Sequence, residues 1–219
     1  MIAGRIKSEA LALVSLSCLA GCGIQPPPNI RPQEVNVASL DPQKWFIYYS
    51  NDMLSHPSAD PNGAWSFEFP GWQKGGHVNY VQTPFNATTM LHNISITFRV
   101  ETNAPQYVVR DTGDILPATF HVFFEQQNDN LSDPNGRWWA RPSKYDLGSQ
   151  DNTSITFVVP LTPDQWTNVF GQQDPNSFYA AFRNVGWIGV TFGGQRFFGH
   201  GVAVSGGSAK YVLVDISVT

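Results

Sequence analysis

The feature that most constrains this fold is a set of short segments in which apolar and polar residues alternate. The clearest is 94–101, where four apolar residues alternate with Ser95, Thr97, Arg99 and Glu101. Successive side chains of a strand point to opposite faces, so this pattern predicts a strand with one buried face. Similar runs predict nine or ten strands in all, at 65–69, 77–81, 120–125, 137–140, 154–159, 186–192, 201–205 and 209–218.

The remainder of the chain contains few helix signals and many breakers. Nineteen Gly and sixteen Pro divide the apolar runs into short pieces, which predicts an all-β fold. We expect residues 42–219 to form one domain, a two-sheet antiparallel β-sandwich with one or two short helical turns. The first turn is predicted at 161–170, where Thr162 would cap it and Pro163 would take its first position. A second, weaker signal lies at 178–182.

A short sequence pattern that occurs twice in the chain indicates two turns with the same chemistry. Residues 60–65 and 133–138 both follow the pattern D-P-N-G-x-W, and 174–176 is a partial third copy. Asp, Pro and Gly each favour a particular position of a tight turn, and Gly permits a positive φ at its exit. We therefore expect two tight connections, each leading into a strand that begins with Trp.

The N-terminal segment is typical of an export signal. Arg5 and Lys7 precede an apolar stretch at 10–20, which is too short to span a bilayer. The residues Leu19-Ala20-Gly21-Cys22 that follow it resemble the bacterial lipobox. This resemblance implies removal of a signal peptide at 1–21 and attachment of a diacylglyceryl group to Cys22.

The same resemblance implies a place in the cell. Gly23 stands where Asp would favour inner-membrane retention, so the expected location is the bacterial outer membrane. The lipid would supply the membrane affinity, and the Pro-rich segment 22–41 would form an extended tether. The alternatives are a plain secretory signal with an unrelated Cys, and a buried N-terminal helix. Cys18 would leave with the signal, so the mature domain would have no thiol for a disulfide or a metal.

Charge and motifs argue against several function classes. The chain has 13 Lys and Arg against 17 Asp and Glu, without a basic run, which argues against a nucleic-acid partner. The motif G-x-S-x-G is absent, and the strand carboxylates form no short-range pattern (Glu68, Glu101, Glu125 and Asp215). We therefore favour a protein that is not an enzyme, with a glycan-cleaving enzyme as the less favoured alternative.

The order of the predicted elements over 42–219 resembles the jelly-roll sandwich of carbohydrate-binding modules. The resemblance lies in the alternating strands, a helical turn after Val159-Pro160-Leu161, and a Gly-rich segment before a long C-terminal strand. It implies a non-catalytic surface for a glycan. The alternative is a structural or assembly lipoprotein that docks an envelope protein at a sheet edge or face.

Seven residues are candidates for ligand binding. Sugar rings have apolar C–H faces that pack on exposed aromatic rings, and the aromatic candidates are Trp72, Trp138 and Trp139. We expect Trp72, in a polar loop, to be exposed, and the adjacent Trp138 and Trp139 to point to opposite faces. The polar candidates are Arg99, His121, Glu125 and His200.

Each of these candidates also has an ordinary structural explanation. A Trp can belong to the core, and Arg99, His121 and Glu125 can lie on a solvated face with cross-strand ion pairs. We expect Arg99 to share one concave sheet face with His121 and Glu125. His200 stands between two glycines, whose backbone freedom could aim its ring into a pocket or simply form a turn.

Metal signals are sparse. The five His show no H-x-x-x-H spacing, so no catalytic metal or other cofactor is expected. The segment 128–135 is rich in oxygen donors and is a candidate for a structural Ca²⁺, although Pro134 also suits a plain turn.

Overall fold

The structure is a computed structural model that describes residues 38–87, 91–103, 105–110, 118–129, 132–141, 145–149, 152–194 and 200–219. The predicted signal at 1–21, the lipidation residue Cys22 and the tether up to residue 37 lie outside these residues. Among the described residues, no helix is both long enough and apolar enough to cross a membrane.

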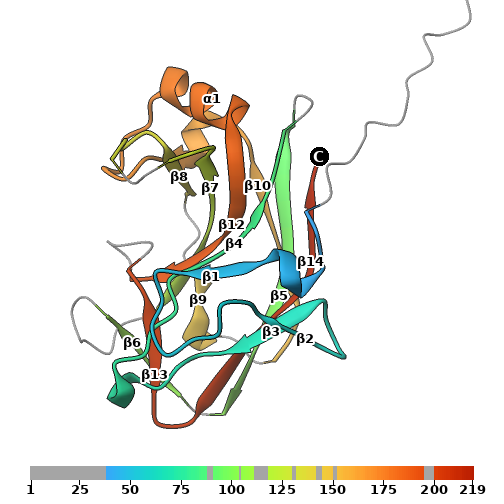
Figure 1. The fold of residues 1–219 in the computed structure, drawn as a ribbon, viewed down its shortest axis with the longest axis vertical. Helices are drawn as coiled ribbons and strands as arrows, with labels where there is room; N and C mark the ends of the chain where they lie inside the picture. Colours follow the sequence, from blue (N-terminus) through green and yellow to red (C-terminus); the bar gives the residue numbers. More distant parts are fainter. Residues whose placement is uncertain are drawn as a thin grey trace, which may run out of the picture. The chain divides into compact units, whose positions relative to one another are not determined.

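The domain is all-β and contains two large antiparallel sheets, as predicted (Figure 1). The seven-stranded sheet has the order β1 (Phe46–Tyr48), β4 (Tyr80–Pro84), β12 (Val185–Gly193), β7 (Thr119–Gln126), β8 (Arg137–Ala140) and β11 (Trp166–Thr167), and β9 (Tyr145–Asp146) also pairs with β7. The five-stranded sheet has the order β10 (Ile155–Pro160), β5 (Asn93–Asn103), β14 (Ser208–Val218), β3 (Trp65–Glu68) and β2 (Ser58–Ala59). A small third sheet pairs β6 (Gln106–Val109) with β13 (Val202–Ser205). The jelly-roll order of connections stays a prediction.

The core lies between the two large sheets. Strand β5 alternates between buried and half-buried residues as its sequence predicts, and Phe98 is completely buried. The Phe98 ring contacts Phe120 of the opposite sheet, with the ring centroids 4.4 Å apart. Phe67 meets Phe192 in the same way at 5.6 Å. These aromatic contacts across the sandwich help to hold the two sheets together.

The helical turn predicted at 161–170 forms, with Thr162 and Pro163 at the predicted positions, but it is shorter than predicted. Only the 3-10 turn η4 (Pro163–Gln165) forms there, and Trp166 then enters strand β11 opposite Ala140. The Trp166 ring is completely buried, and its Nε1 donates to the Pro160 carbonyl at 2.8 Å. Burial of this large ring in the sandwich outweighs the local helix signals.

The one α-helix among the described residues is α1 (Pro175–Arg183), near the weaker signal at 178–182. The partial third copy of the turn motif is its N-terminus. The Asp174 side chain accepts from the Asn176 N–H at 3.0 Å and from the Ser177 hydroxyl at 2.6 Å. This is the expected chemistry of a helix cap, with Pro175 at the first helical position.

The two complete D-P-N-G-x-W segments are tight connections, as predicted. In each, the Asp side chain accepts from the Asn N–H two residues later, at 2.9 Å from Asn62 and 2.8 Å from Asn135. The role predicted for the glycines is wrong, because neither adopts a positive φ. A Cβ on Gly63 would lie 2.7 Å from the Leu213 carbonyl oxygen, and these glycines are therefore explained by lack of space.

Candidate functional site

The outer face of the seven-stranded sheet, which points away from the five-stranded sheet, carries an unusual set of side chains. The strand register aligns them in rows: Thr191 pairs with Tyr80 and His121, Gly189 with Gln82 and Phe123, and Trp187 with Pro84 and Glu125. Strand β8 extends two of these rows, because Trp139 pairs with Phe123 and Arg137 with Glu125. The outer face therefore combines aromatic, charged and amide groups on adjacent strands.

Aromatic rings form a second small core on this face. Tyr80, Phe123 and Trp139 are all buried there, and the centroids of Tyr80 and Phe123 are 5.1 Å apart. Gly189 lies on the strand between them and has no side chain to separate the rings. A Cβ on Gly189 would overlap the Val81 carbonyl oxygen, so the backbone geometry of β12 at this point requires glycine.

Other aromatic rings extend this face toward solvent at the β1 edge. Trp187 is half-buried and meets Phe46 and Tyr48 edge to face, with centroid distances of 5.9 and 6.1 Å. Tyr48 and Tyr49 are 40% and 60% exposed. These rings offer apolar surface to a ligand and keep hydroxyl groups available for hydrogen bonds.

A buried charge cluster lies beside the rings. Arg137 forms an ion pair with Asp129 at 2.8 Å, and the Asp129 side chain is completely buried. Burial, together with the Asp129 charge, raises the pKa of Glu125 to about 7 against the opposing effect of Arg137. Burial also raises the pKa of Tyr80 to about 12, against the opposing effect of Arg137. Glu125 thus changes its protonation near neutral pH, where it faces Arg137.

His121 is neutral at physiological pH. Burial lowers its pKa to about 4, and the contact of Nδ1 with the Ala140 carbonyl at 3.4 Å only partly offsets this. Its Nε2 lies 3.1 Å from the Thr119 hydroxyl. His121 is therefore a hydrogen-bonded residue of the buried face at neutral pH and carries no positive charge there.

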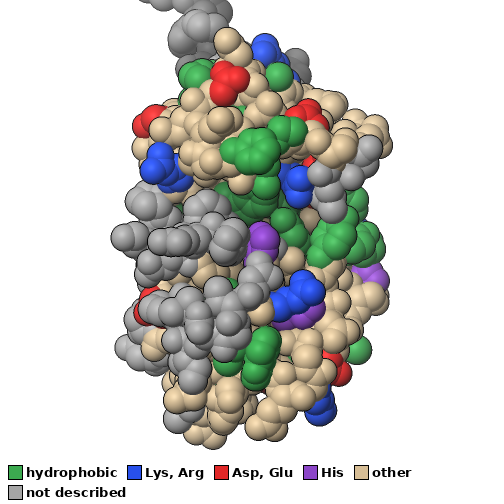
Figure 2. All heavy atoms as spheres, turned by 90° about the vertical axis from the view of Figure 1, so that its left-hand side faces the viewer, with side chains coloured by type: hydrophobic (Ala, Val, Ile, Leu, Met, Phe, Trp, Pro, Cys, Tyr) green, Lys and Arg blue, Asp and Glu red, His purple; other side chains and the backbone are tan. Residues whose placement is uncertain are grey.

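A cavity of about 400 Å³ opens next to this cluster. We call it the arginine–histidine cavity, and its described lining residues are Tyr49, His77, Asn79, Tyr80, Arg110, Arg137 and His200. None of these lining residues is an Asp or a Glu. Figure 2 shows the corresponding side of the molecule, where basic and histidine side chains lie close together near the middle and the visible acidic ones lie nearer its margins.

Backbone contacts between distant segments build this cavity. Asn51 and His77 exchange two backbone hydrogen bonds of 2.9 and 3.0 Å, and Val78 and Val202 exchange another two of 2.9 Å. The Arg110 N–H donates to the Gly201 carbonyl at 3.0 Å. The lining residues are therefore held by pairing between strand ends, although they come from five separate parts of the chain.

Two of the lining residues each have one buried side-chain atom that lacks a hydrogen-bond partner within the described structure. These atoms are Nδ1 of His77 and Oδ1 of Asn79, in residues that are only 7% and 6% exposed. The opposite edge of the His77 ring is occupied, because Nε2 lies 3.1 Å from the Tyr49 carbonyl oxygen. Buried polar atoms almost always have partners, so these two atoms mark the cavity as a place for a polar ligand.

The structure brings four of the seven predicted residues to this region. His121, Glu125 and Trp139 lie on the outer face, and His200 lines the cavity. Trp139 is only 4% exposed, so it supports the face from below and offers little surface itself. Gly201, which follows His200, has a φ of 98°, in agreement with the backbone freedom inferred there.

The predicted shared face for Arg99, His121 and Glu125 is wrong. Arg99 belongs to β5 in the five-stranded sheet, whereas the other two belong to β7 in the seven-stranded sheet. Arg99 donates from Nε and Nη2 to one oxygen of Glu101, at 2.9 and 2.8 Å. It also lies 3.6 Å from Asp60, which Lys210 contacts at 3.2 Å. This ion-pair network joins β5, β14 and the turn between β2 and β3, and it agrees with the ordinary structural explanation for Arg99.

Two of the predicted Trp residues lie away from the cavity. Trp138 points into the core, where it is completely buried and its Nε1 donates to the Asn135 carbonyl at 2.7 Å. It points to the opposite face from Trp139, as predicted. Trp72 lies in the 3-10 turn η2 (Trp72–Lys74) and is half-buried, so the expectation that it is exposed is wrong.

Sequence reasoning missed Trp187 on the outer face and six of the seven described lining residues of the cavity: Tyr49, His77, Asn79, Tyr80, Arg110 and Arg137. One signal was available, because the alternation in β8 places Arg137 on the same face as Trp139. The alternation in β12 similarly aligns Trp187 with the outer face. Tyr49 and Arg110 lie in connections without a pattern, and only the fold brings them to the cavity.

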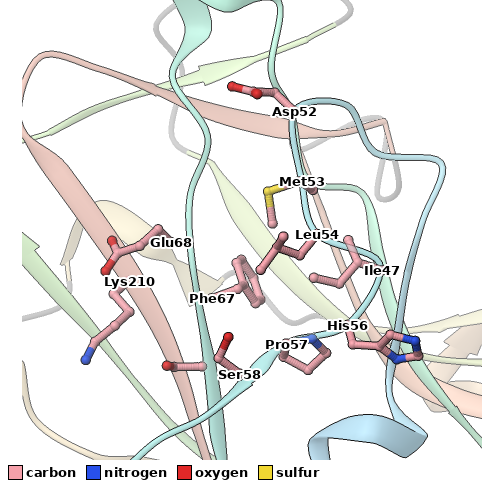
Figure 3. Close-up of a pocket in the computed structure, with 11 residues that line it drawn as sticks. Ile47, Asp52, Met53, Leu54, His56, Pro57, Ser58, Phe67, Glu68 and Lys210 are labelled. Atoms are coloured by element: carbon pink, nitrogen blue, oxygen red, sulfur yellow. The ribbon is translucent and has the colours of Figure 1, made fainter.

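A second cavity, of about 390 Å³, is shown in Figure 3. Apolar side chains of Ile47, Leu54 and Phe67 face one another there, and Glu68 and Lys210 stand to one side. Lys210 already forms ion pairs with Asp60 and Glu101. None of the described residues that line it has a buried polar atom without a partner, so it makes a weaker case for a polar ligand.

The described residues contain no group of three or more His, Cys, Asp or Glu side chains that could hold a metal ion. The predicted calcium segment 128–135 is described except for residues 130 and 131. Its two described carboxylates contact protein groups: Asp129 pairs with Arg137, and Asp133 accepts from the Asn135 N–H. This arrangement fits a plain turn followed by a strand.

No protein-family model matches this chain, and no curated protein matches it either.

Proposed function

We propose that this protein binds a glycan, without cleaving it, on the outer face of its seven-stranded sheet. The observation that carries the proposal is the position of solvent-exposed aromatic rings next to a cavity with convergent polar groups. Tyr48 and Tyr49 would pack against the apolar C–H faces of sugar rings. The arginine–histidine cavity would provide the hydrogen bonds that orient the ligand.

The size of the cavity agrees with this function. At about 400 Å³ it lies toward the lower end of the range of small-molecule sites, which is about 300–1,000 Å³. One sugar unit would occupy the cavity, and neighbouring units would extend over the aromatic rings at the β1 edge. Binding would therefore involve an end or a branch of a longer glycan.

The positions of the carboxylates favour binding over hydrolysis. Glycoside hydrolysis requires two carboxyl groups on opposite sides of one scissile bond. Glu68 and Glu101 lie on the five-stranded sheet on either side of Lys210, whereas Glu125 lies on the other sheet. No described residue that lines the arginine–histidine cavity is a carboxylate.

The proposal places the domain on the surface of a bacterial membrane. The lipobox-like residues 19–22, the acyl group on Cys22 and the tether 22–41 would hold it at the outer membrane, near envelope glycans. Expression in a bacterium with radiolabelled palmitate tests this part. Label should enter the full chain and be absent from the Cys22→Ala variant, and label retained by that variant would contradict the lipid anchor.

Glycan binding itself is tested with the full chain, purified in detergent, on a panel of glycans and peptidoglycan fragments. The Tyr49→Ala variant should bind at least tenfold more weakly than the unmodified chain. Tyr179→Ala is the matched control, because Tyr179 is 46% exposed but lies on α1. Absence of binding to any member of the panel, or equal loss in both variants, would refute the proposed function.

A second candidate function, docking of an envelope protein, is favoured by one observation. Strand β10 pairs only with β5 among the described strands, and its Val158 is 55% exposed. An unpaired strand edge can accept a strand from another chain. Envelope pull-downs with Val158→Lys and the unmodified chain test this, and an identical set of captured proteins would count against docking at β10.

A further inference from the structure

We propose that the arginine–histidine cavity binds the acidic group of a negatively charged sugar, a carboxylate or a phosphate ester. This inference rests on the proposed glycan-binding function and names the class of glycan. It is carried by three features of the cavity: its positive charge, its unpartnered polar atoms and its rigid wall.

The first feature is the charge of the cavity. Arg110 and Arg137 line it together with His77 and His200, and no carboxylate is present among the described lining residues. The buried Asp129 compensates the charge of Arg137. Arg110 is exposed and forms no ion pair within the described segments. Its guanidinium can therefore bind a carboxylate or a phosphate through two parallel hydrogen bonds.

The second feature distinguishes a sugar from a bare anion. Oδ1 of Asn79 is buried, lacks a partner and can only accept hydrogen bonds. An ionised carboxylate or phosphate oxygen has no proton to donate and would be repelled by Oδ1. A hydroxyl group can donate to it, and another hydroxyl can bond to Nδ1 of His77. The complete set of lining groups therefore fits a molecule with both an acidic group and hydroxyl groups.

The third feature is the rigidity of the wall that holds these atoms. The His77 ring is held by the contact of Nε2 with the Tyr49 carbonyl at 3.1 Å. On its other side the backbone of Gly201 lies so close that a Cβ there would be 2.8 Å from Cδ2 of His77. The ring thus has one orientation, and its unpartnered Nδ1 is positioned before the ligand arrives. Such preorganisation lowers the cost of binding.

Calorimetric titration of the full chain in detergent tests the inference with four probes: glucuronic acid, glucose 6-phosphate, glucose and inorganic phosphate. We expect at least one acidic sugar to bind at least tenfold more tightly than glucose and than inorganic phosphate. Its affinity should decrease as salt is added, because the attraction involves the exposed Arg110. Preference for the carboxylate or for the phosphate ester identifies which acidic group the cavity binds.

Two substitutions test whether the acidic sugar binds in the arginine–histidine cavity. Arg110→Gln should weaken binding of the acidic sugar at least tenfold, and Asn79→Asp, which places a negative charge beside the ligand, should abolish it. Arg183→Gln is the matched control, because it removes one exposed positive charge on α1 and should change affinity less than twofold. Since Arg110 is exposed, its variant should fold even if Asn79→Asp does not.

Results that contradict this inference can be distinguished from results that contradict the glycan-binding function. If glucose binds as tightly as the acidic sugars and Arg110→Gln has no effect, this inference is wrong while the glycan-binding function stands. If inorganic phosphate binds as tightly as glucose 6-phosphate, the cavity is an anion site and the sugar-specific part is wrong. If neither these probes nor the glycan panel bind, both the inference and the proposed function fail.

Discussion

Glu125 provides the sharpest test of the electrostatics of the outer face. Its side chain is buried opposite Arg137 and near Asp129, and burial raises its pKa from 4.5 to about 7. The folded protein therefore binds a proton at Glu125 that the unfolded chain releases at lower pH. Stability from this group is fully present below about pH 4.5 and is lost as the pH rises through about 7.

The size of the effect follows from the two pKa values. A difference of about 2.5 (7 minus 4.5), at about 1.36 kcal/mol for each pH unit, corresponds to at most about 3.4 kcal/mol. Residual contact with solvent screens part of this, since Glu125 is 9% exposed, so we expect about 2 kcal/mol. Glu125→Gln removes the ionisable group and keeps a similar shape.

Urea denaturation at pH 5 and at pH 8.5 measures the prediction. At pH 5 the free energies of unfolding of Glu125→Gln and the unmodified protein should agree within about 1 kcal/mol. At pH 8.5 the variant should be more stable by about 2 kcal/mol. Equal differences at the two pH values, or a less stable variant at pH 8.5, would refute the raised pKa.

Glu101→Gln is a control, because its effect on the pH dependence of stability should have the opposite sign. Hydrogen bonds from Lys210 and Arg99 lower the pKa of Glu101, despite some desolvation. Its ionised form therefore stabilises the folded protein above pH 4.5, and this contribution is lost as the pH falls through the lowered pKa. Glu101→Gln should be less stable than the unmodified protein at pH 8.5, and this deficit should diminish toward acidic pH.

Two further predictions concern packing and ion pairs. Gly189→Ala should destabilise the fold by about 3 kcal/mol, because the new Cβ overlaps the Val81 carbonyl oxygen. Gly71→Ala, where the Cβ meets nothing within 4 Å, should leave the Tm nearly unchanged, and similar melting of the two variants would contradict the packing argument. Asp60→Asn should cost about 2 kcal/mol, because it keeps the turn but removes a buried charge that pairs with a Lys and an Arg. Asp133→Asn, at the equivalent position of the other turn, is exposed and should cost less than about 0.5 kcal/mol in the same urea titration.

Much of the fold was predictable because its signals are local. The alternation at 94–101 predicts the buried face of β5, and Asp at the start of each D-P-N-G-x-W segment predicts the turn that forms there. These signals depend on residues that are close in sequence, so they persist in any fold that contains the strand or the turn. Residues 161–170 show the limit of such signals, because burial of Trp166 outweighs a helix pattern of one or two turns.

The candidate site was predictable only in part. His200 and Glu125 were recognised as polar residues that could meet a ligand, but their partners could not be assigned. Arg99 was grouped with Glu125 because both lie on the polar side of a strand, whereas the topology assigns their strands to different sheets. Alternation determines which side of a strand a residue occupies and leaves open which strand lies next to it.

By itself, the sequence determined the class of fold, the longer strands, the two D-P-N-G-x-W turns and, through the lipobox-like residues, the expectation of a lipid anchor. Only the tertiary structure decided that Tyr49, His77, Arg110, Arg137 and His200 surround one cavity. The physical reason is that strand pairing between distant segments, such as His77 with Asn51 and Val78 with Val202, assembles this cavity. Such long-range pairing depends on how the whole core packs, and no short stretch of sequence contains that information.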